Sequence, residues 1–138
     1  MNVLVDTSIW SMALRRNTMP DKTVIRELRN LILGRRVETM GPIRQELLSG
    51  LREEAQFKRL QKHLAAFPDL ALETDDYVMA AKFFNLCRAK GVQGSNTDFL
   101  ICAVAVRRHL SIYAADKDFL CFAKHLPIML YEKSGLFP

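Results

Sequence analysis

Four acidic residues lie far apart in this chain, yet each falls where alternating strands and helices would deliver it to one rim: Asp6, Glu46, Asp98 and Asp116. Asp6 ends the apolar run Val3–Val5, and Asp116 follows the run Ser111–Ala115. Both runs are short and apolar, as buried strands are. Ligands of open parallel sheets bind beyond the carboxyl ends of the strands, so these two acids are predicted to share a site. The other two acids are predicted to come from helices.

Several carboxylates gathered on one rim repel each other, by about 4 kcal/mol for each pair at about 4 Å if the effective dielectric constant is about 20. Such a cluster needs a cation. The predicted ligands are all oxygens, without histidine or thiolate, which favours Mg²⁺ or Mn²⁺ over zinc. One or two such ions could polarise a phosphodiester, generate hydroxide from bound water and neutralise the leaving oxygen. This is the chemistry of a metal-dependent nuclease, and it requires no side-chain nucleophile.

Each acid also has a purely structural interpretation. Asp6, Asp98 and Asp118 could all be N-caps or first-turn acids that bind free backbone N–H groups at a helix start. For Asp118 this interpretation is preferred, and for Asp6 alone the two interpretations are equally good. Glu46 taken alone is typical of a glutamate at the surface of a helix. The functional interpretation therefore depends on the four acids as a set.

The elements that must position these acids are predicted from hydrophobic spacing. Strands are expected over Val3–Val5, Val37–Met40, Leu70–Leu72, Ser111–Ala115 and Ile128–Tyr131. Helices are expected at Ile9–Leu14, from Val24 to Ile32, from Pro42 past Glu46, at Glu53–Phe67, Tyr77–Leu86 and Phe99–Val106, with a short one from Phe119. This alternation predicts an α/β fold with a parallel sheet. The helix Phe99–Val106 is apolar all round and should pack deep against the sheet.

Glycines and capping residues mark the predicted helix ends. Gly34 is expected at the C′ position of the second helix, and Gly91 should terminate the helix that begins near Tyr77. Thr74 or Asp75 is expected to cap the start of that helix. The segment from Arg15 to Pro20 is interpreted as a polar loop.

Length and composition limit the class of protein. A chain of 138 residues with 49% hydrophobic and 25% charged residues is predicted to form one domain over residues 1–138. No apolar stretch approaches the ~20 residues of a membrane span, and no signal peptide is indicated, so we expect a cytoplasmic protein with no membrane partner. The three cysteines lack metal-ligand spacing and are expected to be buried, reduced thiols. They are Cys87, Cys102 and Cys121.

The formal charge of +5 and the pI of about 9.3 suggest an anionic partner. Cations are dense in the first half of the chain: Arg26, Arg29, Arg35, Arg36, Arg44, Arg52, Lys58, Arg59 and Lys62. Such a surface could hold a polyanion against a metal-filled acidic centre. For any one of these cations taken alone, a solvated helix face is the better interpretation.

Four segments of the sequence resemble those of a known protein family. The matching signatures are Val3-Leu4-Val5-Asp6-Thr7-Ser8, Glu46 on the Pro42 helix, Asn96-Thr97-Asp98 before Phe99-Leu100-Ile101-Cys102-Ala103, and Ala115-Asp116-Lys117-Asp118-Phe119. In this order and in so short a chain they resemble the PIN domain family, and within it the VapC-type toxin ribonucleases of toxin–antitoxin pairs. The resemblance covers essentially the whole chain.

The resemblance implies a three-layer α/β/α sandwich with a central parallel sheet. It implies that Asp6, Glu46, Asp98 and Asp116 are catalytic, with Asp6, Asp98 and Asp116 as ligands of one or two Mg²⁺ or Mn²⁺ ions. The expected activity is endoribonuclease cleavage of RNA. The expected partners are a cognate antitoxin protein and a second copy of the chain in a homodimer.

One position departs from the family pattern. The family usually has Thr or Ser two residues before the fourth acid, and this chain has Ala114 there. Thr7 or Ser8 is expected to supply the missing hydroxyl. The supporting residues of the site are therefore expected to be Thr7, Ser8, Asn96 and Asp118.

Two other classes of protein with acids at strand ends fit the sequence less well. A phosphatase of the haloacid dehalogenase kind needs a second acid two residues after Asp6, where Ser8 stands. A receiver domain needs a Lys at a strand end in the last third, and Lys117 is a poor substitute. The remaining alternatives are a housekeeping PIN nuclease and a non-catalytic RNA-binding or protein-interaction module whose acids only cap helices.

Overall fold

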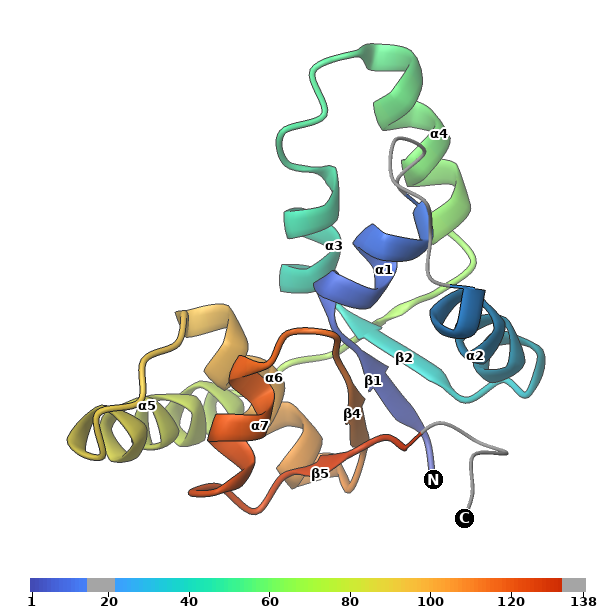
Figure 1. Ribbon diagram of the computed structural model, residues 1–138. Helices are drawn as coiled ribbons and strands as arrows, with labels where there is room; N and C mark the ends of the chain where they lie inside the picture. Colours follow the sequence, from blue (N-terminus) through green and yellow to red (C-terminus); the bar gives the residue numbers. More distant parts are fainter. Residues whose placement is uncertain (15–21, 133–138) are drawn as a thin grey trace.

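The computed structural model describes residues 1–14 and 22–132, and Figure 1 shows their arrangement. Five strands of the described chain form a sheet in the order β3-β2-β1-β4-β5, with every pair parallel. The strands are β1 (Val3–Val5), β2 (Val37–Met40), β3 (Asp69–Leu70), β4 (Ser111–Tyr113) and β5 (Met129–Leu130). The central strand is β1, which is fully buried. The predicted parallel sheet is confirmed.

Helices cover both faces of the sheet. Those that connect β1, β2 and β3 are α1 (Thr7–Leu14), α2 (Lys22–Leu33), α3 (Gly41–Leu48) and α4 (Glu54–Leu64). Those that connect β3, β4 and β5 are α5 (Thr74–Ala89), α6 (Asn96–Arg108) and α7 (Asp118–Ala123). The chain changes direction across the sheet after β3, and right-handed crossovers then put the two sets on opposite faces, as Figure 1 shows. The predicted α/β/α sandwich is confirmed.

The helix α6 forms the centre of the second helical layer. Every side chain from Phe99 to Ala105 is buried, which confirms the prediction of deep packing. The Phe99 ring contacts the Phe122 ring of α7, with 4.8 Å between centroids. Gly94, in the loop before α6, lies against both rings. These contacts fix the start of α6 relative to α7.

Strand β4 is shorter than predicted and ends at Tyr113 instead of Ala115. The Tyr113 carbonyl accepts a hydrogen bond from the Asp6 N–H at 2.9 Å. The next available donor, the Ala115 N–H, binds the Ser8 hydroxyl at 3.0 Å and not another strand. Pairing therefore ends where β1 gives way to α1, and Asp116 lies in the loop beyond the strand.

The prediction that Gly34 is the C′ residue of α2 is wrong by one position. Arg35 N–H donates to the Ile32 carbonyl and Arg36 N–H donates to the Leu31 carbonyl, each at 3.0 Å. These are the two bonds of a Schellman motif whose C′ residue is Arg35, with a φ of 55°. At the end of α5 the left-handed residue is a glycine, Gly91, as predicted.

The start of α5 also differs from the prediction of Thr74 or Asp75 as the cap. The N-cap is Glu73, which forms a capping box with Asp76. The Asp76 carboxylate accepts a hydrogen bond from the Glu73 N–H at 2.7 Å. Asp76 is fully buried because arginines from α6 bind its carboxylate.

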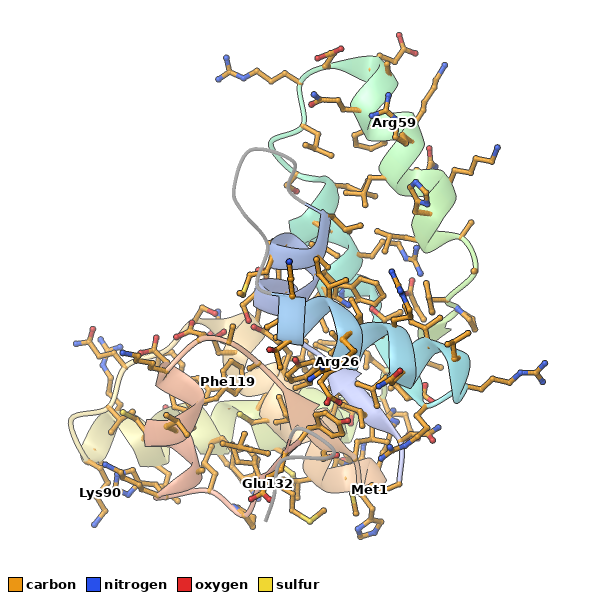
Figure 2. All side chains as sticks on the ribbon, turned by 45° about the vertical axis from the view of Figure 1, so that its right-hand side comes forward. Met1, Arg26, Arg59, Lys90, Phe119 and Glu132 are labelled. Atoms are coloured by element: carbon orange, nitrogen blue, oxygen red, sulfur yellow. The ribbon has the colours of Figure 1, made fainter. Side chains whose placement is uncertain are left out.

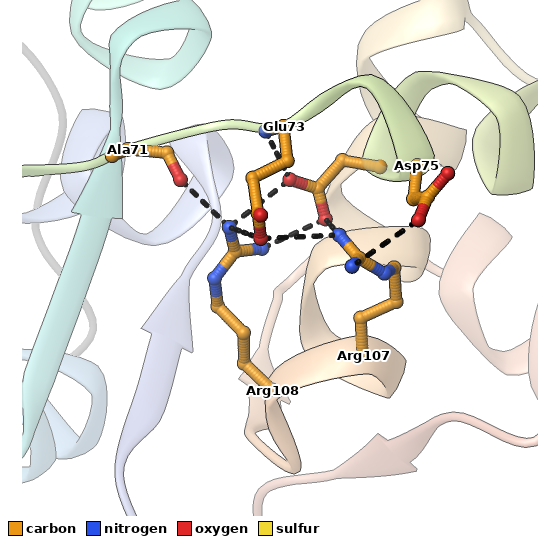
Figure 3. A network of polar contacts seen from close by, with 6 residues as sticks. Ala71, Glu73, Asp75, Arg107 and Arg108 are labelled. Atoms are coloured by element: carbon orange, nitrogen blue, oxygen red, sulfur yellow. Dashed lines mark hydrogen bonds and ion pairs between the residues drawn. The ribbon is translucent and has the colours of Figure 1, made fainter.

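Those arginines join the end of α6 to the start of α5 (Figure 3). Arg107 and Arg108 donate to Asp76 Oδ1 at 2.7 and 2.8 Å. Arg108 also donates to Asp76 Oδ2 and to the Ala71 carbonyl. Burial alone would raise the pKa of Asp76. The hydrogen bonds from Arg108, the Glu73 N–H and Arg107 outweigh this effect and lower the pKa to about 2.

The α4 helix is shorter than the predicted Glu53–Phe67 span. The carbonyls of Leu64 and Phe67 accept hydrogen bonds from the guanidinium of Arg44 on α3. The same guanidinium pairs with Asp69 at 3.1 Å. The chain after Leu64 therefore bends toward α3 and does not continue the helix. The predicted polar loop at Arg15–Pro20 lies outside the described residues.

The cysteines are all free thiols, and Cys87 and Cys102 are buried as predicted. Cys121 is exposed, so that part of the prediction is wrong; it lies on α7, between the buried Phe119 and Phe122. Within the described ranges, the structure contains no helix long and apolar enough to cross a membrane.

Candidate active site

Asp6 lies directly after β1 and is 5% exposed. Its Oδ2 atom accepts hydrogen bonds from the Ser8 N–H at 3.1 Å and from the Ser8 hydroxyl at 2.5 Å. Its backbone carbonyl accepts from the Ile9 N–H at 3.1 Å, so the residue also starts α1. The side chain is thus fixed through one oxygen.

Ser8 connects the ends of the two central strands. Its hydroxyl donates to Asp6 and accepts a hydrogen bond from the Ala115 N–H. Ser8 on α1 therefore supplies a hydroxyl at the start of the Asp116 loop. This replaces the hydroxyl that the family usually has at the position of Ala114. Of the two residues expected to replace it, Ser8 makes both of these bonds.

Asp98 lies in the first turn of α6 and belongs to a capping box. Its carboxylate accepts from the Ser95 N–H, and its own N–H donates to the Ser95 hydroxyl, each at 3.1 Å. Burial raises the pKa of Asp98, the hydrogen bonds with Ser95 lower it, and the charges of Asp6 and Asp116 raise it. Asp98 therefore caps a helix and also faces two other acids.

Glu46 lies on α3 and is partly desolvated although the residue as a whole is exposed. Burial raises the pKa of Glu46, a hydrogen bond with the Thr97 hydroxyl lowers it, and the charges of Asp6 and Asp98 raise it. The Thr7 hydroxyl also lowers this pKa. Glu46 thus faces the same space as Asp6 and Asp98.

Asp116 is exposed in the loop between β4 and α7. Its Oδ1 atom accepts a hydrogen bond from the Asp118 N–H at 2.9 Å, and its carbonyl accepts from the Phe119 N–H at 3.2 Å. Asp116 therefore binds the start of α7. Asp118 is exposed in the first turn of that helix, where a negative charge is favourable.

The structure brings together the four acids that we call the acidic site: Asp6, Glu46, Asp98 and Asp116. They come from β1, α3, α6 and the loop after β4, so each arrives from a separate part of the chain. Among the expected supporting residues, Thr7 and Ser8 lie beside them, and Asn96 is the first residue of α6. Asp118 is the first residue of α7, and its N–H binds the Asp116 carboxylate. Thr97 was given no role by the sequence, although it lies inside the Asn96–Asp98 signature.

The donor set of the acidic site fits a hard divalent cation, since all its ligands would be carboxylate oxygens. The Thr7 Oγ1 atom is buried there beside Glu46 without a partner in good hydrogen-bonding geometry, which is where a ligand or water could bind. Within residues 1–14 and 22–132, no three His, Cys, Asp or Glu side chains are close enough to hold one ion together. Mg²⁺ commonly uses one or two carboxylates and completes its shell with water and substrate phosphates. The described side chains are compatible with that mode of binding.

Solved structures with the same fold are known. The crystal structure of FitAcB from Neisseria gonorrhoeae has a TM-score of 0.76 and 21% identity, over 97% of this chain and 99% of that chain. VapBC2 from Rickettsia felis, bound to a DNA fragment from their promoter, has a TM-score of 0.74 and 16% identity, over 95% and 98%. VapBC-5 from Mycobacterium tuberculosis has a TM-score of 0.67 and 19% identity, over 96% and 99%.

A search of curated proteins gave no match. The family model of the PIN domain, in contrast, matches residues 3–124, which is most of the chain and includes all four acids of the acidic site. The chain therefore belongs to the PIN domain family.

Proposed function

We propose that the chain is a Mg²⁺- or Mn²⁺-dependent endoribonuclease formed by one domain over residues 1–138. The observation that carries this proposal is the convergence of four carboxylates from four separate segments. The charges of Asp6 and Asp98 raise the pKa of Glu46, and those of Asp6 and Asp116 raise the pKa of Asp98. Helix capping does not account for Glu46, which lies on α3 beyond its first turn and still faces Asp6 and Asp98. Membership of the PIN domain family supports the same class of activity.

In this proposal Asp6, Asp98 and Asp116 hold one or two divalent ions. A bound ion would supply Lewis-acid activation of a phosphodiester and of a water molecule. Ser8 keeps the Asp6 carboxylate in place and links it to the Asp116 loop. Glu46 is the acid outside the metal set, and its raised pKa suits it to accept a proton from the attacking water.

RNA cleavage with and without metal tests the proposal. We expect cleavage of single-stranded RNA to need added Mg²⁺ or Mn²⁺, and Asp6→Asn or Asp98→Asn to lower the rate by at least about 100-fold. Asp118→Asn is the matched control, since its carboxylate lies outside the acidic site, and it should retain most of the activity. Full activity in a chelator would contradict the mechanism. A folded protein that cleaves no RNA with either metal would favour a non-catalytic binding module.

We further propose that the chain is the toxin of a toxin–antitoxin pair, and that it forms a homodimer. The support is the similarity of its fold to VapBC and FitAcB structures, the first including a complex with promoter DNA. A basic side chain of the antitoxin would enter the acidic site and neutralise it. Charge reversal at Asp98 should therefore weaken antitoxin binding, and light scattering at tens of micromolar should give the mass of a dimer. Unchanged antitoxin affinity or a monomer mass would count against the respective parts.

A further inference from the structure

A cavity of about 490 Å³ lies beside the acidic site and is lined by three helices. Figure 1 shows the first turn of α6 between α3 and α5. The lining residues are Pro42 and Gln45 of α3, Tyr77, Ala80, Ala81, Phe84 and Asn85 of α5, and Asn96, Thr97 and Leu100 of α6. None of these side chains carries a formal charge.

The cavity and the acidic site share residues. Thr97 lines the cavity, and its hydroxyl lies close enough to Glu46 to lower the pKa of that carboxyl. Gln45 lines the cavity and precedes Glu46 on α3. A ligand whose reacting group lies at the acidic site can therefore extend a neighbouring group into the cavity.

The chemistry of the lining indicates what that group is. The lining has no Arg or Lys to pair with a phosphate and no carboxylate to pair with an ammonium group, so a neutral group suits it best. Two aromatic rings, Tyr77 and Phe84, and three side-chain amides offer stacking surfaces together with hydrogen-bond donors and acceptors. Unstacked bases in single-stranded RNA are recognised by this combination.

We propose that the cavity binds the base of a nucleotide next to the scissile phosphate of a single-stranded RNA, and so sets the base preference of cleavage. This inference rests on the proposed ribonuclease function. Tyr77 is 54% exposed and supplies the stacking surface. The Phe84 ring is held against the Phe99 ring, with 5.5 Å between centroids, and forms a fixed wall. The amides of Asn85 and Gln45 read the edge of the base.

Binding of six-nucleotide RNA strands to the full chain tests the inference. Each strand has an abasic nucleotide at one position, and fluorescence anisotropy in a chelator measures the Kd so that no strand is cut. Loss of the base at one position should weaken binding to wild type by about 5- to 150-fold, the range for stacking of one base. Tyr77→Ala should bind the intact strand as weakly as wild type binds that abasic strand.

Three further variants test whether the cavity itself binds the base. Tyr77→Phe keeps the ring and should retain the base discrimination that Tyr77→Ala loses. Val78→Ala alters the neighbouring side chain, which is 47% exposed and does not line the cavity, and should also behave like wild type. Asn85→Ala should weaken discrimination between bases at the position found by the abasic scan.

The inference is overturned if no abasic position changes the Kd by more than about twofold, or if Tyr77→Ala keeps the wild-type discrimination. It is also overturned if Tyr77→Ala lowers the molecular mass in solution while discrimination survives, since the cavity would then be a contact between copies of the chain. Cleavage is measured separately. A protein that binds the base through Tyr77 but cuts no RNA would contradict the ribonuclease proposal and leave the base site in place.

Discussion

The carboxylate of Asp98 holds the start of α6 and faces two other acids at the same time. The capping and functional interpretations of such a residue are therefore compatible. Asp6 and Asp116 behave in the same way, since each accepts a hydrogen bond from a backbone N–H two residues later. A site built from helix starts gains rigid carboxylates, because the capping bonds restrict their rotation.

Ser8→Ala removes only one oxygen atom, but it should disturb the acidic site strongly because that oxygen makes two hydrogen bonds. The change removes a donor to Asp6 Oδ2 and an acceptor for the Ala115 N–H. We expect a loss of about 1 kcal/mol in the free energy of unfolding, measured by urea denaturation, together with a lower kcat. Ser8→Thr keeps the hydroxyl and should retain more activity. Equal activity of wild type and Ser8→Ala would show that the Asp6 rotamer does not depend on Ser8.

At the scale of elements, the packing of α6 against α7 depends on a residue without a side chain. A Cβ at Gly94 would lie 2.6 Å from the Phe122 ring and 3.0 Å from the Phe99 ring. Gly94→Ala should therefore destabilise the protein by about 1–3 kcal/mol through overpacking. Displacement of α6 from α7 should also lower the cleavage rate, because Asp98 and Asp116 are attached to these two helices.

Gly41→Ala is the matched control for Gly94→Ala. A Cβ at Gly41 meets no atom within 4 Å, and the residue is in the first turn of α3. Alanine there lowers the freedom of the unfolded chain but is disfavoured in a helical conformation directly before Pro42, so the two effects oppose each other. The urea denaturation midpoint of Gly41→Ala should therefore stay close to that of wild type, whereas that of Gly94→Ala should fall. A stable Gly94→Ala protein would mean that the two rings can shift at little cost.

The Asp76 carboxylate at the junction of α5 and α6 should make the free energy of unfolding depend on pH in the acidic range. The pKa of Asp76 is about 2 in the folded protein and 3.8 in the unfolded reference. Its lowered pKa stabilises the fold fully above about pH 4, and this contribution is lost as the pH falls toward 2. Melting temperatures measured between pH 6 and 2 should show this loss in wild type.

Asp76→Asn should remove that part of the pH dependence and destabilise the protein near pH 7 by about 1–3 kcal/mol, since Arg107 and Arg108 lose a charged partner. Asp75→Asn is the control. Its side chain is 80% exposed and lies 4.0 Å from Arg107, so the change should alter stability very little. An Asp76→Asn profile parallel to that of wild type would exclude Asp76 as the source.

At the scale of the whole molecule, the acidic site should make the stability of the fold depend on metal. Without a cation, Asp116→Asn removes one of the repelling charges and keeps an oxygen that can accept from the Asp118 N–H. We therefore expect the variant to melt above wild type in a chelator. Mg²⁺ should raise the melting temperature of wild type more than that of the variant, because it binds only the folded state. A lower melting temperature for the variant, without a Mg²⁺ effect on wild type, would assign Asp116 to capping alone.

The net charge of the molecule says less about RNA binding than the positions of the individual Arg and Lys side chains. Arg44 is used to hold the end of α4, and Arg36 donates to the Met1 carbonyl. Arg26 on α2 and Arg59 on α4, labelled in Figure 2, are exposed and remain available to a polyanion. Arg44 and Arg36 thus bind other parts of the chain, whereas a solvated helix face was the prediction for any single cation, and net charge alone does not define a path for RNA.

The sequence was sufficient to predict elements with strong periodicity, because burial decides both the pattern and the structure. The alternating order, the parallel sheet and the deep packing of α6 followed from apolar spacing. The ends of elements were predicted less well, because long-range partners determine them. Arg44 ends α4, Ser8 ends the pairing of β4, and Arg107 with Arg108 holds the carboxylate that caps α5.

The convergence of the acids could be predicted from the topology, since strand ends and helix starts meet at one edge of a parallel sheet. The cavity beside them could not be predicted. Its lining comes from three helices, and side chains such as Tyr77 and Asn85 look like ordinary surface residues in the sequence. Only the packing of α5 beside α3 and α6 brings them together.

The register of the sheet has a consequence for how the activity arises during folding. Val3 in the central strand pairs with Val37 on one side and with Ser111 on the other. The second pairing closes a very long loop, and such non-local contacts form late and slowly. Asp6 and Asp116 can face each other only after that event, so folding intermediates should lack the acidic site. Pulse-labelling hydrogen exchange should therefore find β1 and β2 protected before β4, and the acidic site should form only in the last stage of folding.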